Sequence, residues 1–170
     1  MTEKWKRFNG EDIEDLGNTI LSDIANSDTE DLEFYIGGDS QWSAGKVKFT
    51  VAIIMIRKGK GGRGYYKNTV PLETSLSLQQ RLFMETFKSV KVALWLNPLL
   101  ESIGYKVNEI HTDLNPNPKH ASYEMVYTCL GYIRGMGFEG KAKPNIWAAS
   151  SVSDYKTKYI KKKSSWYICI

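Results

Sequence analysis

The order of hydrophobic and polar positions divides the chain into helical and extended segments. Apolar residues three and four positions apart predict a short amphipathic helix with an acidic exposed face within residues 10–27. Residues 32–42 and 46–58 are rich in aromatic and β-branched types and flank the turn segment "SAG", which predicts a β-hairpin. A third strand is expected at residues 63–71, after the glycine-rich turn "GKGG".

The longest periodic segment, residues 74–103, predicts a helix that Pro98 breaks or kinks. It has two apolar stripes, so we expect it to pack between a sheet and another helix. The pattern beyond it predicts a strand, a helix ended by glycine, a short strand and a final helix, in that order, at residues 105–113, 120–137, 138–143 and 145–160.

This order predicts an α/β fold in which one mixed five-stranded sheet, with three antiparallel strands followed by parallel strands, is flanked by helices. At 170 residues the chain fits one domain. We divide it into a helical lead-in (1–30), the α/β domain (31–160) and a basic tail (161–170).

The formal net charge of +4 permits nucleic-acid binding without requiring it. Positive charge gathers in residues 57–63 and 155–163, whereas residues 9–33 are acidic, so we expect a lopsided charge distribution. Cys129 and Cys169 lack metal-ligand spacing, which argues against a disulfide framework or a structural zinc site. No apolar run reaches the length of a membrane span, and we expect a soluble, cytoplasmic protein.

Four acidic residues fall at informative places in this order. Asp39 lies inside the first long strand, Glu85 interrupts an apolar stripe of the long helix, Asp113 follows the fourth strand, and Asp154 lies on the final helix. A half-buried carboxylate is costly without a cationic partner. Two Mg²⁺ or Mn²⁺ ions about 4 Å apart would supply that partner and activate water for phosphodiester cleavage. The alternative is that each acid separately caps a turn, faces solvent or forms a salt bridge.

The segments "YIGGDSQ", "RKGKGGR", "HTDLNP" and "KPNIWAASSVSDYKTK" together resemble the YkuK-type family of ribonuclease-H-like proteins, over residues 33–158. The predicted order of elements agrees with that fold. The resemblance implies a metal-dependent nuclease in which Asp39, Glu85, Asp113 and Asp154 form the metal-binding and catalytic set. If the helix register differs, Glu73 or Glu101 would replace Glu85.

Other residues are candidates for contact with RNA, DNA or an RNA–DNA hybrid. Those expected to bind the nucleic acid are Ser40, Gln41, Arg57, Lys58, Lys60, Arg63, Asn115, Lys156 and Lys158. Turn capping is the alternative for Asn115, and a solvated turn or tail is the alternative for the cations. His111 and His120 are candidates for proton transfer, against a packing or surface role.

Two glycines precede the first acid, and Gly37 and Gly38 would leave room for a backbone or a substrate beside Asp39. The function expected from these features is a two-metal nuclease. The rival is a non-catalytic nucleic-acid or protein-binding module on the same fold, in which the basic segments bind the partner.

Overall fold

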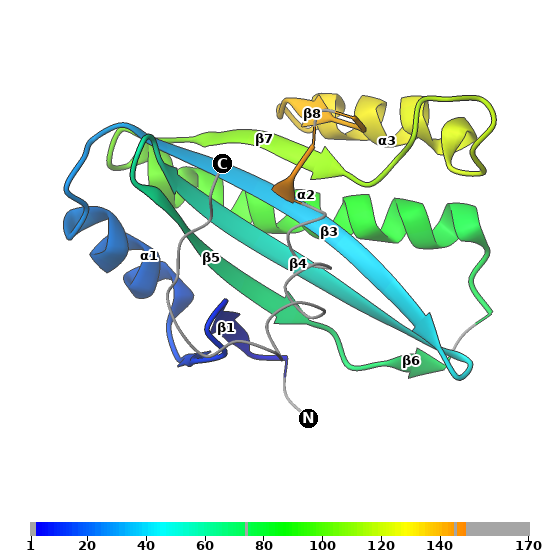
Figure 1. Ribbon diagram of the computed structural model, residues 1–170, viewed down its shortest axis with the longest axis horizontal. Helices are drawn as coiled ribbons and strands as arrows, with labels where there is room; N and C mark the ends of the chain where they lie inside the picture. Colours follow the sequence, from blue (N-terminus) through cyan, green and yellow to red (C-terminus); the bar gives the residue numbers. More distant parts are fainter. Residues whose placement is uncertain (1–2, 74, 145, 149–170) are drawn as a thin grey trace.

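The computed structural model describes residues 3–73, 75–144 and 146–148 (Figure 1). The elements in chain order are β1 (Trp5–Arg7), β2 (Asp12–Ile13), α1 (Leu16–Ala25), β3 (Leu32–Ser43), β4 (Lys46–Arg57), β5 (Gly61–Asn68), β6 (Leu72–Glu73), α2 (Leu78–Glu101), β7 (Val107–Thr112), α3 (Tyr123–Gly135) and β8 (Gly140–Lys141).

The sheet is mixed and has the strand order β2-β1-β5-β4-β3-β7-β8, with β6 paired to β4. Strand β3 is antiparallel to β4 and parallel to β7, and β7 is parallel to β8. The five strands from β5 to β8 along this order confirm the predicted mixed α/β sheet. The sheet has eight strands and not five, because the short strands β1, β2 and β6 join it. Elements of two or three residues are too short to give a periodic signal.

The β3–β4 hairpin is the longest part of the sheet and carries the first candidate acid. Its two-residue turn consists of Ala44 and Gly45, whose φ angles of 49° and 75° are the left-handed values that tight hairpin turns require. The turn sets a register in which Asp39 lies opposite Thr50. Asp39 is therefore four residues before the end of β3.

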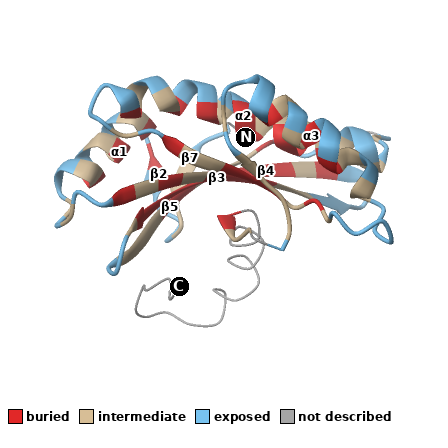
Figure 2. Ribbon diagram, turned by 90° about the horizontal axis from the view of Figure 1, so that it is seen from above, coloured by how far each residue is buried: buried red, intermediate tan, exposed pale blue. Residues whose placement is uncertain are grey.

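Helices α1, α2 and α3 all lie on the same face of the sheet (Figure 2). Helix α2 packs on β3, β4 and β7 and also contacts α3, as its two apolar stripes predict. Its core-facing residues include Val90, Ala93 and Leu96, which are fully buried. The apolar stripe that contains Leu94 does not pack along its whole length, because Leu94 is 46% exposed. Pro98 does not end the helix, which continues to Glu101.

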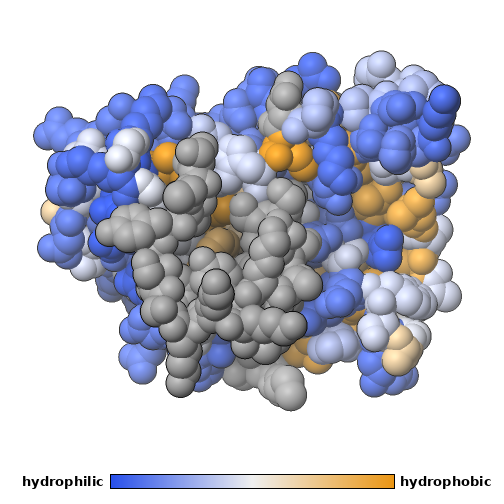
Figure 3. Space-filling model, in the orientation of Figure 1, coloured by the Kyte–Doolittle hydropathy of each residue, from blue (hydrophilic) through white to orange (hydrophobic). Residues whose placement is uncertain are grey.

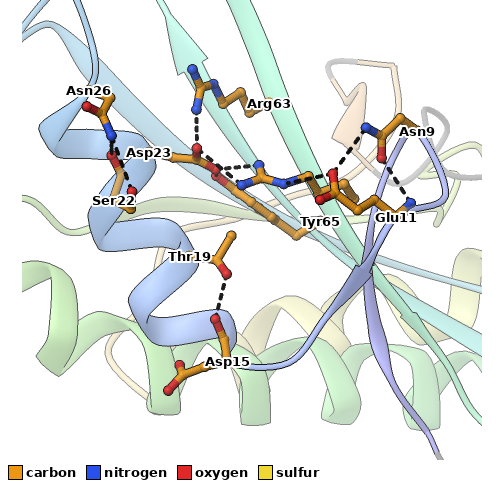
Figure 4. Close-up of polar contacts among 10 residues, drawn as sticks. Asn9, Glu11, Asp15, Thr19, Ser22, Asp23, Asn26, Arg63 and Tyr65 are labelled. Carbon is orange, nitrogen blue, oxygen red and sulfur yellow. Dashed lines mark hydrogen bonds and ion pairs between the residues drawn. The ribbon is translucent and has the colours of Figure 1, made fainter.

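The lead-in is joined to the sheet by a buried acid. Asp23 of α1 accepts hydrogen bonds from Arg7 (2.5 Å), the hydroxyl of Tyr65 (2.7 Å) and Arg63, as Figure 4 shows. Burial raises the pKa of Asp23, but the hydrogen bonds from Arg7 and Tyr65 and the charge of Arg63 outweigh burial and leave its pKa lowered. The prediction that the acidic face of this helix is exposed is therefore wrong at Asp23, which is 5% exposed, because two arginines on β1 and β5 cover it.

The expected final helix lies outside the described residues except for 146–148, as do Asp154, Lys156, Lys158 and the basic tail. Within the described parts of the chain, no helix is long and apolar enough to cross a membrane.

Candidate metal-binding and catalytic site

Two of the four predicted acids start from adjacent positions on neighbouring strands. The parallel register of β3 and β7 pairs Gly38 with Thr112, and the next residue on each strand is Asp39 and Asp113, respectively. Neighbouring strands lie about 4.8 Å apart. The two carboxylates therefore arise side by side at the carboxyl end of β7.

Helix α2 brings the third acid to the same place because Gly38 lets it approach closely. A Cβ atom at Gly38 would lie 2.6 Å from Ser89 Oγ and 2.9 Å from the carbonyl oxygen of Glu85. Only glycine fits such an approach, and the room predicted at this position is filled by the α2 backbone. Two residues along β3, the Ser40 hydroxyl donates a 2.5 Å hydrogen bond to Glu85 Oε1.

Glu85 is 8% exposed, and its environment disfavours a negative charge. Burial is the largest cause and raises its pKa to about 8; the Ser40 hydrogen bond and the Arg81 charge act against it, whereas the charges of Asp39 and Asp113 raise it further. The three carboxylates thus lie close enough for their charges to act on one another. A cation among them would relieve both burial and mutual repulsion.

Asp113 and Glu85 each have a polar partner within the protein. Lys143 Nζ lies 2.6 Å from Asp113 Oδ1, on side chains that are 43% and 38% exposed. Glu85 is held by Ser40, as described above. Among the described residues, no three His, Cys, Asp or Glu side chains are arranged to hold a metal ion. Asp154, the fourth predicted acid, is outside that set of residues.

An open cleft of about 680 Å³ lies next to Asp113, because Lys143, which forms an ion pair with Asp113, also lines the cleft. Its lining residues are Asn115, Pro116, Asn117, Lys143, Pro144 and Ile146. The Asn115 side-chain oxygen accepts the Asn117 N–H at 2.9 Å, so this side chain has the turn-capping role that was its alternative. The cleft has a largely apolar lining and carries Lys143 at the edge of the carboxylate group.

His111 lies on the opposite face of the sheet from α2 and is 1% exposed. Its Nδ1 accepts hydrogen bonds from the backbone N–H groups of Trp147 and Ala148, at 3.4 and 3.2 Å, so Nε2 carries the proton and donates to Glu109 at 2.9 Å. Burial lowers the pKa of His111 despite the Glu109 carboxylate. This neutral ring holds the segment that leads towards Asp154.

The basic hairpin between β4 and β5 is far from the carboxylates. Seven residues of β4 separate Thr50, opposite Asp39, from Arg57, and at about 3.3 Å per residue this is about 23 Å. The hairpin cations also pair with the acidic segment of residues 9–33. The ion pairs are Arg57 with Asp28, Lys58 with Asp31 and Glu33, Lys60 with Asp28, and Arg63 with Asp23. The two oppositely charged segments largely neutralise each other there.

The two alternatives to Glu85 lie elsewhere. Glu73 forms an ion pair with Lys46 on the β4–β6 edge. Glu101 ends α2, 16 residues after Glu85, or about 24 Å along the helix. The structure therefore brings Glu85, and neither alternative, next to Asp39 and Asp113.

Sequence reasoning missed Lys143 and the contact of Ser40 with Glu85. Lys143 lies in the segment "KPNIWAASSVSDYKTK", but no sequence spacing predicts that a residue after β8 lies beside the end of β7. The Ser40 contact had a usable signal, because residues two apart on a strand face the same side and Gly38 already required close approach of a helix.

Comparison with known proteins gives the family. The profile described as ribonuclease H-like matches residues 15–158. The chain belongs to this family. This ribonuclease H-like chain is 30% identical over 135 residues to a protein of Bacillus subtilis (strain 168) named "Uncharacterized protein YkuK", with 72% of this chain and 77% of the relative covered. The resemblance to the YkuK-type family is thereby confirmed. No solved structure matches the chain at a significant level.

Proposed function

We propose that the protein is a metal-dependent nuclease that cleaves phosphodiester bonds of a nucleic acid. The observation that carries the proposal is the buried carboxylate of Glu85, on which the charges of Asp39 and Asp113 act and whose pKa is raised to about 8. Such a group needs a cation to ionise at neutral pH. Perturbed acids of this kind gather at functional sites more often than elsewhere.

The donor set fits Mg²⁺ or Mn²⁺. All the donors are oxygens, from the carboxylates of Asp39, Glu85 and Asp113 and the hydroxyl of Ser40, and hard divalent cations prefer such ligands. In the proposed site Asp39, Glu85, Asp113 and Asp154 hold the ions. When bound, a pair of ions supplies an activated water and stabilises the leaving oxygen.

The protein's own groups have distinct roles in this site. Asp39 and Asp113 come from rigid parallel strands and fix the direction of the carboxylates. Ser40 orients Glu85 through its hydrogen bond. Lys143, at 2.6 Å from Asp113, provides an ammonium group at the mouth of the cleft, where it can bind a substrate phosphate.

The second candidate is a non-catalytic nucleic-acid-binding module on the same fold. The Asp113–Lys143 ion pair favours it, because this pair neutralises one carboxylate without a metal. In such a module Asp39 would take no part in catalysis, and its charge would not be needed for binding.

Cleavage of labelled single-stranded RNA, RNA–DNA hybrid and branched DNA, each with Mg²⁺, Mn²⁺ or EDTA, tests the proposal. We expect metal-dependent cleavage of at least one substrate, and loss of cleavage with retained binding in Asp39→Asn. Glu101→Gln is the matched control, because this exposed acid accepts only a surface hydrogen bond from Asn97. If folded wild type cleaves none of the substrates, and Asp39→Asn binds them as wild type does, the binding module is the correct function.

A further inference from the structure

An exposed apolar row crosses three strands next to the carboxylates. The register pairs Trp42 of β3 with Val47 of β4, and Val47 with Leu72 of β6, so the three side chains lie in line on one face. Val47 is fully buried in the middle of the row, whereas Trp42 is 45% and Leu72 48% exposed. A large indole face is therefore open to solvent on a strand that also carries Asp39.

The row lies on the same side of the sheet as the Ser40–Glu85 contact. Trp42 follows Ser40 by two residues, so both side chains project from one face about 7 Å apart. Figure 3, seen from the sheet face opposite the helices, shows hydrophobic residues at the end of the molecule where α2 begins. The indole is thus a close neighbour of the carboxylate group.

A lysine lies on the opposite face of the same hairpin. Lys48 lies opposite Gln41 and shares the face of Asp39 on the neighbouring strand. No carboxylate within the described segments forms an ion pair with Lys48, whereas Lys46 is paired with Glu73 at 3.0 Å. The hairpin thus presents an aromatic surface on one side and a lysine on the other, both within two or three residues of Asp39 along or across the strands.

We propose that Trp42, with Leu72 beside it, is a base-stacking surface that makes the protein select single-stranded nucleic acid. This rests on the proposed function, because it assigns the strand that enters the carboxylate site. Every base has a face that can stack on an indole, and only an unpaired base can leave its neighbours to do so.

A protein partner fits this row less well than a nucleobase does. Its two exposed apolar side chains are flanked by Gln41, Ser43, Lys46 and Lys48, so the patch is narrow and its rim is polar. Stable protein interfaces bury on the order of 800 Å² on each partner around a continuous apolar centre. A single exposed indole with a polar rim is the pattern of a base-stacking platform.

Binding of fluorescently labelled oligonucleotides to the full-length chain in EDTA tests this without cleavage. The variants are Trp42→Ala, Trp42→Phe and, as a matched control, Trp95→Ala, whose ring on α2 is 48% exposed and lies more than two turns from Glu85 along the helix. Stacking is worth about 1–3 kcal/mol per base, so we expect Trp42→Ala to weaken single-strand binding about fivefold or more. Trp42→Phe should recover part of the loss, and Trp95→Ala should bind within twofold of wild type.

An oligonucleotide with abasic positions separates stacking from backbone contact. Removal of the bases should weaken binding by wild type by about the same factor as Trp42→Ala weakens binding of the intact strand. Trp42→Ala itself should bind the abasic and the intact strand equally. Equal affinity of Trp42→Ala and wild type for the intact strand would overturn the proposal. The proposal would also be overturned if Trp42→Ala lost as much affinity for duplex and abasic probes as for the intact single strand. A dimer in sedimentation that Trp42→Ala converts to a monomer would overturn it as well.

The outcome is separable from that of the proposed function. Stacking is measured without metal. If Trp42→Ala weakens single-strand binding as expected but wild type cleaves no substrate, the nuclease is rejected and the single-strand site is retained. If the protein shows metal-dependent cleavage and Trp42→Ala affects cleavage of single strands and of duplexes equally, the stacking surface is rejected and the nuclease is retained.

Discussion

Replacing Glu85 by glutamine should make the metal-free protein more stable at alkaline pH. Glutamine keeps the size of the side chain and an oxygen that can accept the Ser40 hydrogen bond, but it carries no charge. Wild-type Glu85 is buried and its pKa is raised to about 8, so its ionised form destabilises the folded state. The variant removes this cost and leaves the packing against Gly38 unchanged.

The sign and size of the effect follow from linkage. Below its ordinary pKa of 4.5 Glu85 is protonated in both the folded and the unfolded chain, and its effect on stability is constant. Between that value and about 8 only the unfolded chain ionises, so the free energy of unfolding of wild type falls as pH rises. At about 1.4 kcal/mol per pH unit the loss over this window is on the order of 5 kcal/mol.

Urea denaturation in EDTA between pH 5 and pH 9 measures the difference between wild type and Glu85→Gln. We expect the two free energies of unfolding to diverge steadily up to about pH 8 and to stay apart above it. Glu101→Gln should follow wild type at every pH. If the Glu85→Gln and wild-type curves run parallel, Glu85 is not a buried carboxyl group facing other carboxylates, and the central argument for the site is refuted.

Four further substitutions test the packing around the site, in α3 and in the lead-in. Gly38→Ala should destabilise the fold by about 1–3 kcal/mol, because its Cβ would meet the α2 backbone, whereas Gly131→Ala, with open space around its Cβ, should stabilise it by up to about 1 kcal/mol; denaturation midpoints measure both. Tyr65→Phe removes a donor from buried Asp23 and should cost about 1–3 kcal/mol in the same assay. His111→Phe keeps a ring but loses the Nδ1 acceptor, so the two backbone amides that donate to it should exchange their hydrogens about five- to tenfold faster.

The long elements could be predicted because their signals are local. Residues 32–42 and 46–58 were expected as a hairpin, and β3 (Leu32–Ser43) and β4 (Lys46–Arg57) match them within one residue, since aromatic and β-branched types and a glycine-containing turn act over a few positions. The short strands could not be predicted in this way. Strand β1 (Trp5–Arg7) exists because β5 offers an edge to pair with, which is a tertiary property.

The candidate site was predictable in its acids and less so in its partners. The resemblance to ribonuclease-H-like proteins implied that Asp39, Glu85 and Asp113 belong to one site, and the register of β3 and β7 puts Asp39 and Asp113 at adjacent positions. Which cations face which acids depends on the packed structure. The acidic lead-in covers the basic hairpin at Arg57 and Arg63, so charge that looked free in the sequence is paired, and Lys143, which looked unremarkable, lies beside Asp113.

Pairing within the fold has a consequence for where a nucleic acid can find positive charge. Five of the 23 basic residues and one of the 19 acidic residues lie in residues 149–170, so the rest of the chain is balanced and the whole formal excess of +4 belongs to that segment. The same segment carries Asp154, the fourth predicted acid. Phosphate binding depends on such an excess, and completion of the proposed metal set depends on that acid. Both requirements therefore converge on one part of the chain.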